Sequence, residues 1–369
     1  MKVNFLIASI LSIVTSSTFA APKFYGEIGA NLDYLPENNA TTSDRDVWKI
    51  QNRNSHLGVK GEEKLTERLS AVYLIEWGFN ADGDKTDWSQ RDRYVGLKDT
   101  QLGTLKIGKQ NSPLKKLSSA VDGFNNDVDN DADITGIMPG ENRINNSVAY
   151  ESPQFALNEQ STLGFNLLLA TGESQGIKSN QGGVTVDGGG LGDAWSTSIT
   201  YADPMFLAAI AYDKAIPSNF LGRGFLNATD TQTDIDKVFA AANTLRLTGR
   251  IKPIEGLTLK ALIQKSEVAE AKGNDTATAN IDDSIGWLIG AEYRLPNLDK
   301  WKLKAQYSQN STSFKNDDAD YDAKQIMAGV DYSFNKQVKA YGYTGYATFK
   351  QADAKDKQPV VGTGLEFKF

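Results

Sequence analysis

Apolar and polar residues alternate with a period of two in one segment of the chain after another. From Phe24 to Tyr34 the even positions are apolar or glycine and the odd positions are mostly polar, so an extended strand would have one apolar face. We count sixteen such segments, each about the length that a tilted membrane strand needs, roughly 9–11 residues. The least regular is Val338–Phe349, whose tyrosines do not keep one parity.

Connections of two kinds join these segments, and the two kinds alternate along the chain. Seven connections are short, and eight are longer and polar. The long ones lie at about residues 35–51, 79–90, 111–142, 171–193, 213–242, 266–283, 308–322 and 350–357. In an up-and-down meander this puts every short turn on one side and every long loop on the other, as in outer-membrane barrels. The pattern therefore predicts an all-β fold, a transmembrane antiparallel up-and-down β-barrel of 16 strands.

The two faces of the segments differ in chemistry. Aromatic residues such as Tyr34, Trp77 and Trp195 stand near segment ends, where rings form girdles at the membrane interfaces. The opposite face carries polar side chains such as Glu76 and Arg246, as a water-filled lumen would. Sixteen strands are enough to enclose an aqueous channel. We therefore expect outer-membrane lipid outside the barrel and small polar solutes and ions within it.

The N-terminus and the composition restrict the class of protein further. Lys2, the apolar run Phe5–Val14 and the small-residue site Thr18–Ala20 predict a secretory signal peptide at residues 1–20, followed by a barrel domain at 21–369. The absence of cysteine in an exported chain excludes a disulfide scaffold. A net charge of -7 argues against a nucleic-acid partner, which normally requires a basic excess.

The longest stretch without either apolar period is Asn111–Asn142. A loop of this length within a compact domain is uncommon and is usually functional or disordered. Its five aspartates are Asp122, Asp127, Asp129, Asp131 and Asp133. The last four resemble the start of an EF-hand, but Ala132 replaces the turn glycine and Met138 replaces the bidentate glutamate. We expect no cofactor, and calcium binding only as an opportunistic property.

Five stretches resemble the general diffusion porins of Gram-negative bacteria, especially the neisserial branch, and they follow one another in the order of that family. They are Ser55–Gly61, Arg91–Lys98, Gly103–Lys109, Arg143–Pro153 and Gly362–Phe369. The resemblance covers essentially the whole mature chain. It implies a location in the outer membrane of a Gram-negative bacterium, a homotrimer, and passive diffusion of small hydrophilic solutes. It also implies that the third long loop, residues 111–142, folds into the lumen and narrows it.

The resemblance further implies that the five loop aspartates face basic residues on the barrel wall. The alternation of inward and outward positions along each strand identifies the candidate basic residues of the wall. If Tyr94 lies on the lipid-facing set, Arg91 and Arg93 point inward. If Tyr150 faces lipid, Arg143 points inward. The alternative is that these arginines are ordinary solvated lumen charges or partners of barrel acids.

Two further residues are singled out by the same resemblance. His56 stands where related porins commonly have an arginine, so the wall would lose one fixed charge at the constriction. The C-terminal Phe369 resembles the aromatic signal that the barrel-insertion machinery reads. Both roles are expectations from the family, and neither follows from the periodicity of the chain.

Several questions about function stay open from the sequence. Inward arginines and lysines favour anions and the loop acids favour cations, so the sign of ion selectivity is undecided. Other interpretations are a substrate-specific channel with a saturable site, an adhesion or binding barrel, and an outer-membrane enzyme. A Ser/His hydrolase would have to use His56, the single histidine, which parity places on the lumen side and away from lipid substrates. We therefore expect no enzymatic activity.

Overall fold

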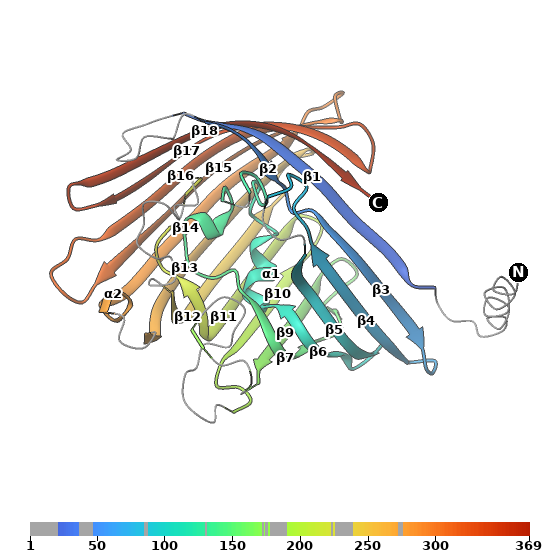
Figure 1. The fold of residues 1–369 in the computed structure, drawn as a ribbon. Coiled ribbons are helices and arrows are strands. Elements are labelled where there is room, and N and C mark those ends of the chain that lie inside the picture. The colour runs from blue at the N-terminus through green and yellow to red at the C-terminus, as the bar shows by residue number, and fades with distance from the viewer. Residues whose placement is uncertain are drawn as a thin grey trace, which may run out of the picture.

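The strands form one antiparallel sheet that closes on itself. The structure, a computed structural model, describes residues 21–36, 47–84, 88–129, 131–171, 173, 176–177, 190–222, 224–225, 239–271 and 276–369. The expected signal peptide at 1–20 lies outside the described residues. Neighbours in sequence pair with one another, and β1 (Lys23–Leu35) pairs with β18 (Ala354–Lys368), which closes the barrel (Figure 1).

Sixteen strands make the barrel wall, as predicted. Among the described residues there are eighteen strand segments, but β2 (Val47–Asn52) and β3 (His56–Lys64) both pair with β1 and are two parts of one strand. Segment β8 (Phe155–Ala156) is a two-residue pair within a turn. The others are β4 (Leu69–Gly78), β5 (Ser89–Asp99), β6 (Gly103–Asn111), β7 (Arg143–Glu151), β9 (Thr162–Ala170), β10 (Trp195–Ala202), β11 (Phe206–Asn219), β12 (Phe239–Ile251), β13 (Leu257–Ala271), β14 (Ile281–Arg294), β15 (Trp301–Phe314), β16 (Tyr321–Ser333) and β17 (Val338–Gln351).

The wall is not of even height. Strands β4–β7, β9 and β10 have 8 to 11 residues, whereas β11–β18 have 13 to 15, which is longer than the sequence pattern predicted. The expected eighth long loop at 350–357 is wrong, because pairing continues up to Gln351 and Ala354 and leaves a two-residue turn. Strand β17 is also regular: Tyr341 and Tyr343 are buried on the lumen side, and Tyr346 is exposed outside.

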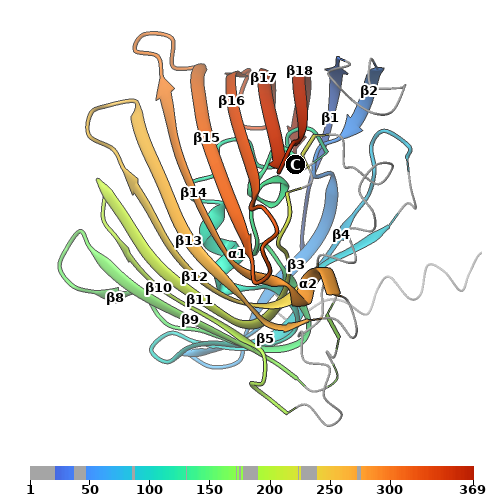
Figure 2. The same ribbon diagram turned by 90° about the vertical axis from the view of Figure 1, so that its left-hand side faces the viewer.

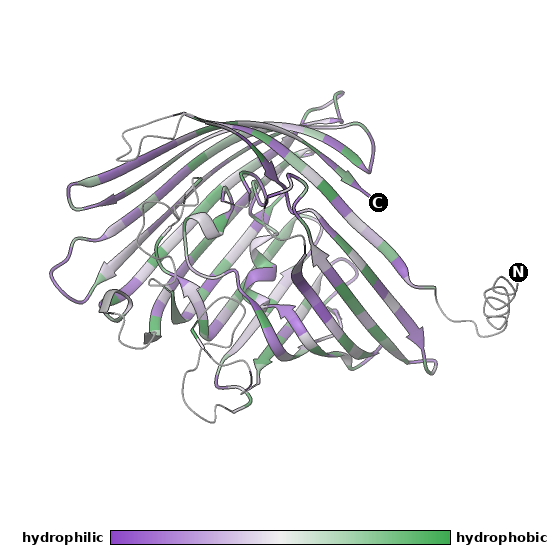
Figure 3. Ribbon diagram, in the orientation of Figure 1, coloured by the Kyte–Doolittle hydropathy of each residue, from purple (hydrophilic) through white to green (hydrophobic). Residues whose placement is uncertain are grey.

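The two faces of the wall have the chemistry that the alternation predicted. Outward aliphatic side chains such as Val95, Ile107 and Ile289 are about half exposed, at 53% each. Inward positions carry polar groups, such as Ser196 and Gln306. Figure 3 shows the resulting alternation of hydrophilic and hydrophobic residues along the strands. Within the described residues, no helix is long and apolar enough to cross a membrane.

The third long loop enters the lumen, as predicted. It carries α1 (Pro113–Ser118), which starts with Ser112 accepting a hydrogen bond from the backbone N–H of Lys115, and a short 3-10 helix at Ile134–Gly136. Leu114 of α1 is fully buried and packs against the inner face of β11. Figure 2 shows α1 within the ring of strands. The other short helix of the described chain, α2 (Thr276–Ala279), precedes β14.

The tip of this loop makes a hydrophobic cluster inside the barrel. Its buried side chains include Phe124, Val128 and Met138, and they contact Met327 and Val360 of the β15–β18 wall. Buried aliphatic and aromatic side chains each contribute roughly 1.5–3 kcal/mol when they leave water. The loop therefore closes the part of the lumen that lies along β15–β18.

A second segment also turns into the lumen, which the sequence pattern did not predict. Phe220 and Phe225, from the long connection between β11 and β12, are 0% and 1% exposed. The Gly224 N–H donates to the Gly136 carbonyl of the third loop at 3.3 Å, and the Tyr321 hydroxyl donates to the carbonyl of Gly222 at 2.9 Å. This segment therefore packs on the third loop and holds it against the wall formed by the longer strands, β11–β18.

Candidate functional site

A cavity of about 490 Å³ lies between the third loop, the wall at β5–β7 and the break between β2 and β3. We call it the throat cavity. Its other lining groups are mainly asparagine and hydroxyl side chains. Its charged lining residues are the basic Arg91, Lys115, Lys116 and Arg143 and the acidic Asp133 and Glu141. Four basic side chains therefore meet two acidic ones around this space.

Arg91 and Arg143 reach the throat cavity from β5 and β7. The Arg91 guanidinium donates to the Glu76 carboxylate of β4 and to the Asn54 side-chain oxygen, the latter at 2.7 Å. The Arg143 Nε donates to Asp92 Oδ1 at 2.5 Å. Both arginines thus line the cavity while each is paired with one carboxylate of the wall. Their part in ion selection stays a prediction.

Arg93 does not join them, so the predicted inward orientation of Arg93 is wrong. Its guanidinium carbon lies 5.4 Å from the centre of the Trp77 ring, and its partner across the strands is Ile75, which is exposed on the outer face. Tyr94 is the inward residue, since the ammonium of lumen-facing Lys106 lies over its ring at 4.6 Å. The register shifts at a β-bulge between Ile75 and Trp77, and a bulge interrupts strict alternation.

His56 stands at the first position of β3. Its Nδ1 is 2.7 Å from the Asn54 carbonyl, and its Nε2 is 3.8 Å from Glu76 Oε2. A wall arginine is nonetheless supplied three residues earlier by Arg53. Because Asn52 pairs with Ala30 and His56 with Glu27, three residues stand opposite two, and this bulge turns Arg53 into the lumen. The polar run between β2 and β3 was the only sequence signal for it.

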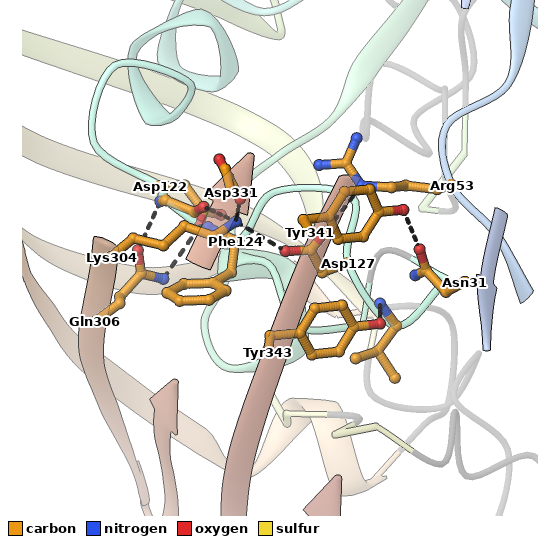
Figure 4. Close-up of polar contacts among 12 residues, drawn as sticks. Asn31, Arg53, Asp122, Phe124, Asp127, Lys304, Gln306, Asp331, Tyr341 and Tyr343 are labelled. Carbon is orange, nitrogen blue, oxygen red and sulfur yellow. Dashed lines mark hydrogen bonds and ion pairs between the residues drawn. The ribbon is translucent and has the colours of Figure 1, made fainter. Parts of the chain in front are cut away.

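Arg53 belongs to a buried set of ionic contacts at the tip of the third loop (Figure 4). Its Nε donates to Asp127 Oδ1 at 2.8 Å, and a second nitrogen donates to the Glu366 carboxylate. Lys304 Nζ lies 3.2 Å from the other Asp127 oxygen and 3.3 Å from Asp331. We call these five residues the tip clamp. All are at most 6% exposed in their side chains, and buried ions are tolerated only when they are paired in this way.

Asp122 is buried beside the tip clamp. Its carboxylate accepts hydrogen bonds from the Gln306 side chain at 3.1 Å and from the backbone N–H groups of Phe124 and Ile134 at 3.1 and 2.9 Å. Burial, followed by the nearby charge of Asp133, raises the pKa of Asp122 to about 7. This carboxylate therefore orders the loop tip and does not line the throat cavity.

The remaining predicted aspartates have different positions. Asp133 accepts the Thr135 N–H at 2.7 Å, which starts the 3-10 helix, and it lines the throat cavity together with Arg91. Asp131 is 2% exposed, and its carbonyl accepts a long hydrogen bond of 3.5 Å from Gln325. Asp129 is half-buried. Of the five aspartates, Asp133 is the one that the structure brings to the throat cavity.

A second buried ionic group fixes the base of the loop. Arg246 of β12 is fully buried and pairs with Glu141, while its Nε donates to the Gln264 oxygen at 2.9 Å. The Ser118 hydroxyl donates to the other Glu141 oxygen at 2.7 Å. Lys115 donates to the Glu141 carbonyl at 2.9 Å, and burial lowers the pKa of Lys115. The loop is therefore held to the wall at its base and at its tip.

The C-terminal residue closes the sheet. The N–H of Phe369 donates to the Gly26 carbonyl and the Gly26 N–H donates to the carbonyl of Phe369, both at 3.1 Å. The Phe369 side chain is 47% exposed on the outer face. Its role in assembly stays a prediction.

The chain is similar to known outer-membrane proteins over nearly its whole length. A family model described as Gram-negative porin matches residues 8–352. The chain is 27% identical to major outer membrane protein P.IA of Neisseria meningitidis serogroup C, over 99% of each protein. It is 26% identical to major outer membrane protein P.IB of Neisseria gonorrhoeae, over 92% of each.

Solved structures with the same fold are also similar to this chain. An anion-selective porin from Comamonas acidovorans has a TM-score of 0.67 at 18% identity, covering 95% of this chain and 100% of that one. The trimer form of OmpT, an outer membrane protein of Vibrio cholerae, has a TM-score of 0.63 at 15% identity, covering 95% and 100%. At these identities the likeness concerns the fold.

Proposed function

Since the chain belongs to the Gram-negative porin family and is an outer-membrane channel for passive diffusion, we propose that the throat cavity is its constriction and that it favours small anions. The observation that carries this proposal is the excess of basic side chains around the cavity, four against two acidic ones. A narrow passage between low-dielectric walls raises the local concentration of ions opposite in charge to its lining. Fixed charges also order the water that a polar solute replaces more readily than an apolar one.

The charge pairs of the wall moderate this preference. Arg91 and Arg143 are each paired with a carboxylate, and Lys116 Nζ lies 2.5 Å from Glu151 Oε1. Paired charges project a weaker field into the passage than free ones. We therefore expect a moderate preference for anions and not a strict filter.

The proposal is tested by reversal potentials in planar bilayers under a potassium chloride gradient. Replacement of both wall arginines, Arg91→Gln and Arg143→Gln, removes two cations from the lining and leaves Glu76 and Asp92 in excess. The permeability ratio should then move toward cations. The control is Arg93→Gln, which removes one positive charge from the outer face and should leave the ratio unchanged. An unchanged ratio in the double variant would remove the throat cavity from ion selection.

A substrate-specific channel with a saturable site is the second candidate. It is favoured by the several convergent donors of the throat cavity, which could hold one carboxylate or phosphate group. Conductance measured over a wide range of potassium phosphate concentration distinguishes the two. A linear rise indicates general diffusion, and saturation at millimolar concentration indicates a specific site.

Transport in this proposal proceeds without a chemical reaction. The single histidine, His56, directs its two ring nitrogens at the Asn54 carbonyl and at the Glu76 carboxylate. A Ser/His pair would need a serine hydroxyl at one of those nitrogens. Ester hydrolysis by the purified barrel above the rate of a His56→Gln variant would contradict this inference.

The assembly in this proposal is a homotrimer. The similar OmpT structure from Vibrio cholerae is described as a trimer form. In this chain the shorter strands β4–β6 offer a contact surface, since Ile75, Val95 and Leu105 are each 40% to 53% exposed on the outer face. Conductance steps that occur in groups of three, together with the mass of the complex in mild detergent, test this arrangement.

A further inference from the structure

A groove of about 590 Å³ crosses the outer face of the barrel between β10 and β14. Three small residues on neighbouring strands form its floor: Ala208, Gly249 and Ala261 are direct partners across β11, β12 and β13. Tyr201 of β10 and Ile289 of β14 continue the same row and close its two ends. The groove is thus a hollow of small side chains on this part of the outer face.

Large apolar side chains border the groove along both of its long sides. On the side of the long loops stands a row of paired residues, Ile199, Ile210, Leu247, Ile263 and Trp287. On the side of the short turns stand Phe206 and Leu259, which are 44% and 41% exposed. The border side chains point away from the lumen, so the groove opens toward the bilayer.

Gly249 is not required by the backbone or by its protein neighbours. Its φ lies outside the left-handed region, and a Cβ added there would meet only the Leu207 carbonyl oxygen, at an ordinary 3.8 Å. Glycine in a strand weakens it, and usually marks a bulge or the close approach of another chain or ligand. No bulge is present at Gly249, where pairing is regular on both sides. The open space above it is therefore a feature that a ligand can use.

We propose that this groove holds one acyl chain of a phospholipid from the periplasmic leaflet of the outer membrane. The outer face of the strands already contacts lipid hydrocarbon, because the protein spans this membrane. The floor lies only three residues from the turn at Lys252, and short turns are periplasmic in such barrels. The groove is consequently at the depth of the periplasmic leaflet, where phospholipid chains run.

The polar groups near the groove favour a lipid over a second protein. Its one outward hydroxyl, that of Tyr201, is already donated to Asp203 Oδ2 at 2.6 Å. An acyl chain requires no hydrogen bond from the groove, so the lining suits it as it stands. Two adjacent turns lie at the periplasmic end, joined by a hydrogen bond of 2.9 Å from the Lys252 N–H to the Met205 carbonyl. They present the exposed ammonium of Lys252 and the exposed carboxylate of Glu255. A zwitterionic head group such as phosphatidylethanolamine matches that pair.

Native mass spectrometry of the purified protein with added palmitoyl-oleoyl phosphatidylethanolamine tests the proposal. The wild-type barrel should keep one phospholipid per chain through collisional activation that removes the detergent. The variant Gly249→Leu, which fills the floor, should lose this adduct. The matched control is Gly342→Leu on the outer face of β17, where an added Cβ would meet only the Gly362 carbonyl oxygen at 3.7 Å, and it should keep the adduct. Normal single-channel conductance of both variants shows that they are folded.

A second measurement identifies the occupant. A phosphatidylethanolamine with a diazirine in its acyl chain should cross-link mainly to residues 199–210, 247–263 and 285–289. Retention of the lipid by Gly249→Leu, or cross-links spread evenly over all outward strand faces, would overturn the proposal. Disulfide cross-links between two copies of a Gly249→Cys variant, in a chain that otherwise has no cysteine, would also overturn it, in favour of a protein contact. Should Gly249→Leu fail to assemble, the smaller change Ala208→Val fills the same floor and decides the question.

Discussion

The two sides of the third loop use the same residue types for different ends. At the tip clamp, Asp127 meets Arg53 and Lys304 with side chains at most 6% exposed. At the throat cavity, Arg91 and Lys116 keep 23% and 36% exposure and face water. A desolvated ion must keep its counter-ion, whereas a hydrated one can exchange it for a passing solute ion. Burial, and not residue type, therefore separates the charges that hold the loop from those that can act on the permeating ions.

The largest effect is expected at the tip clamp. Asp127→Asn removes the carboxylate that ties the loop tip to Arg53 and Lys304, which keep Glu366 and Asp331 of the wall as partners. Loss of these two charge-assisted hydrogen bonds weakens the attachment of the loop tip by about 3 kcal/mol. The loop should leave the β15–β18 wall for part of the time, and single-channel recordings should show larger and noisier conductance. The control Asp318→Asn removes an exposed charge from an outer loop and should change neither quantity.

A double variant sharpens this result. Asp127→Asn combined with Lys304→Met removes the anion and one of its two cations, so the recordings should return part of the way to wild type. A double variant as noisy as the single one would mean that Lys304 and Asp127 are not coupled, and the tip clamp would lose its ionic basis.

An intermediate effect is expected on the throat side. Lys116→Gln removes a half-exposed ammonium that pairs with Glu151. Exposed ion pairs contribute about 0–1 kcal/mol, so the loop should keep its position and the conductance should stay quiet. The reversal potential should move toward cations by less than in the double arginine variant. Noisy conductance in Lys116→Gln would break the distinction between the two sides of the loop.

The smallest effect concerns pH. The pKa of Asp122 is about 7 in the folded protein, well above the ordinary value of 3.8, so the folded loop binds a proton that the released loop gives up. The stability that this proton contributes is complete below about pH 4 and is lost as the pH rises to about 7. Backbone hydrogen exchange at residues 119–129, corrected for the intrinsic rate, should be slower at pH 5 than at pH 8. Asp122→Asn cannot titrate and should show no such difference.

Much of the barrel follows from the sequence, because a period of two is a local property of each strand. The number of strands was predicted, and so was the alternation of short and long connections apart from the expected loop at 350–357. The inward third loop was predicted from the resemblance to porins. The orientation of Arg93 was not, since a bulge depends on the partner strand and leaves no mark in the pattern. The burial of Asp127 and the inward turn of Phe220 depend on contacts with distant strands. Arg53 was missed because it lies in an irregular polar run between two strand segments.

The closure of the barrel also sets an order of events during folding. β1 and β18 pair Glu27 with Lys368, so the wall cannot close before the last residues of the chain are available. Contacts of the tip clamp join residues 74, 177 and 313 positions apart, and such distant contacts form slowly because the intervening chain must be ordered first. The closing pair, Glu27 and Lys368, is more distant still. Because Glu366 of the tip clamp lies on the closing strand β18, the loop tip is fully fastened only when the wall closes, so closure and the narrowing of the channel belong to one late step.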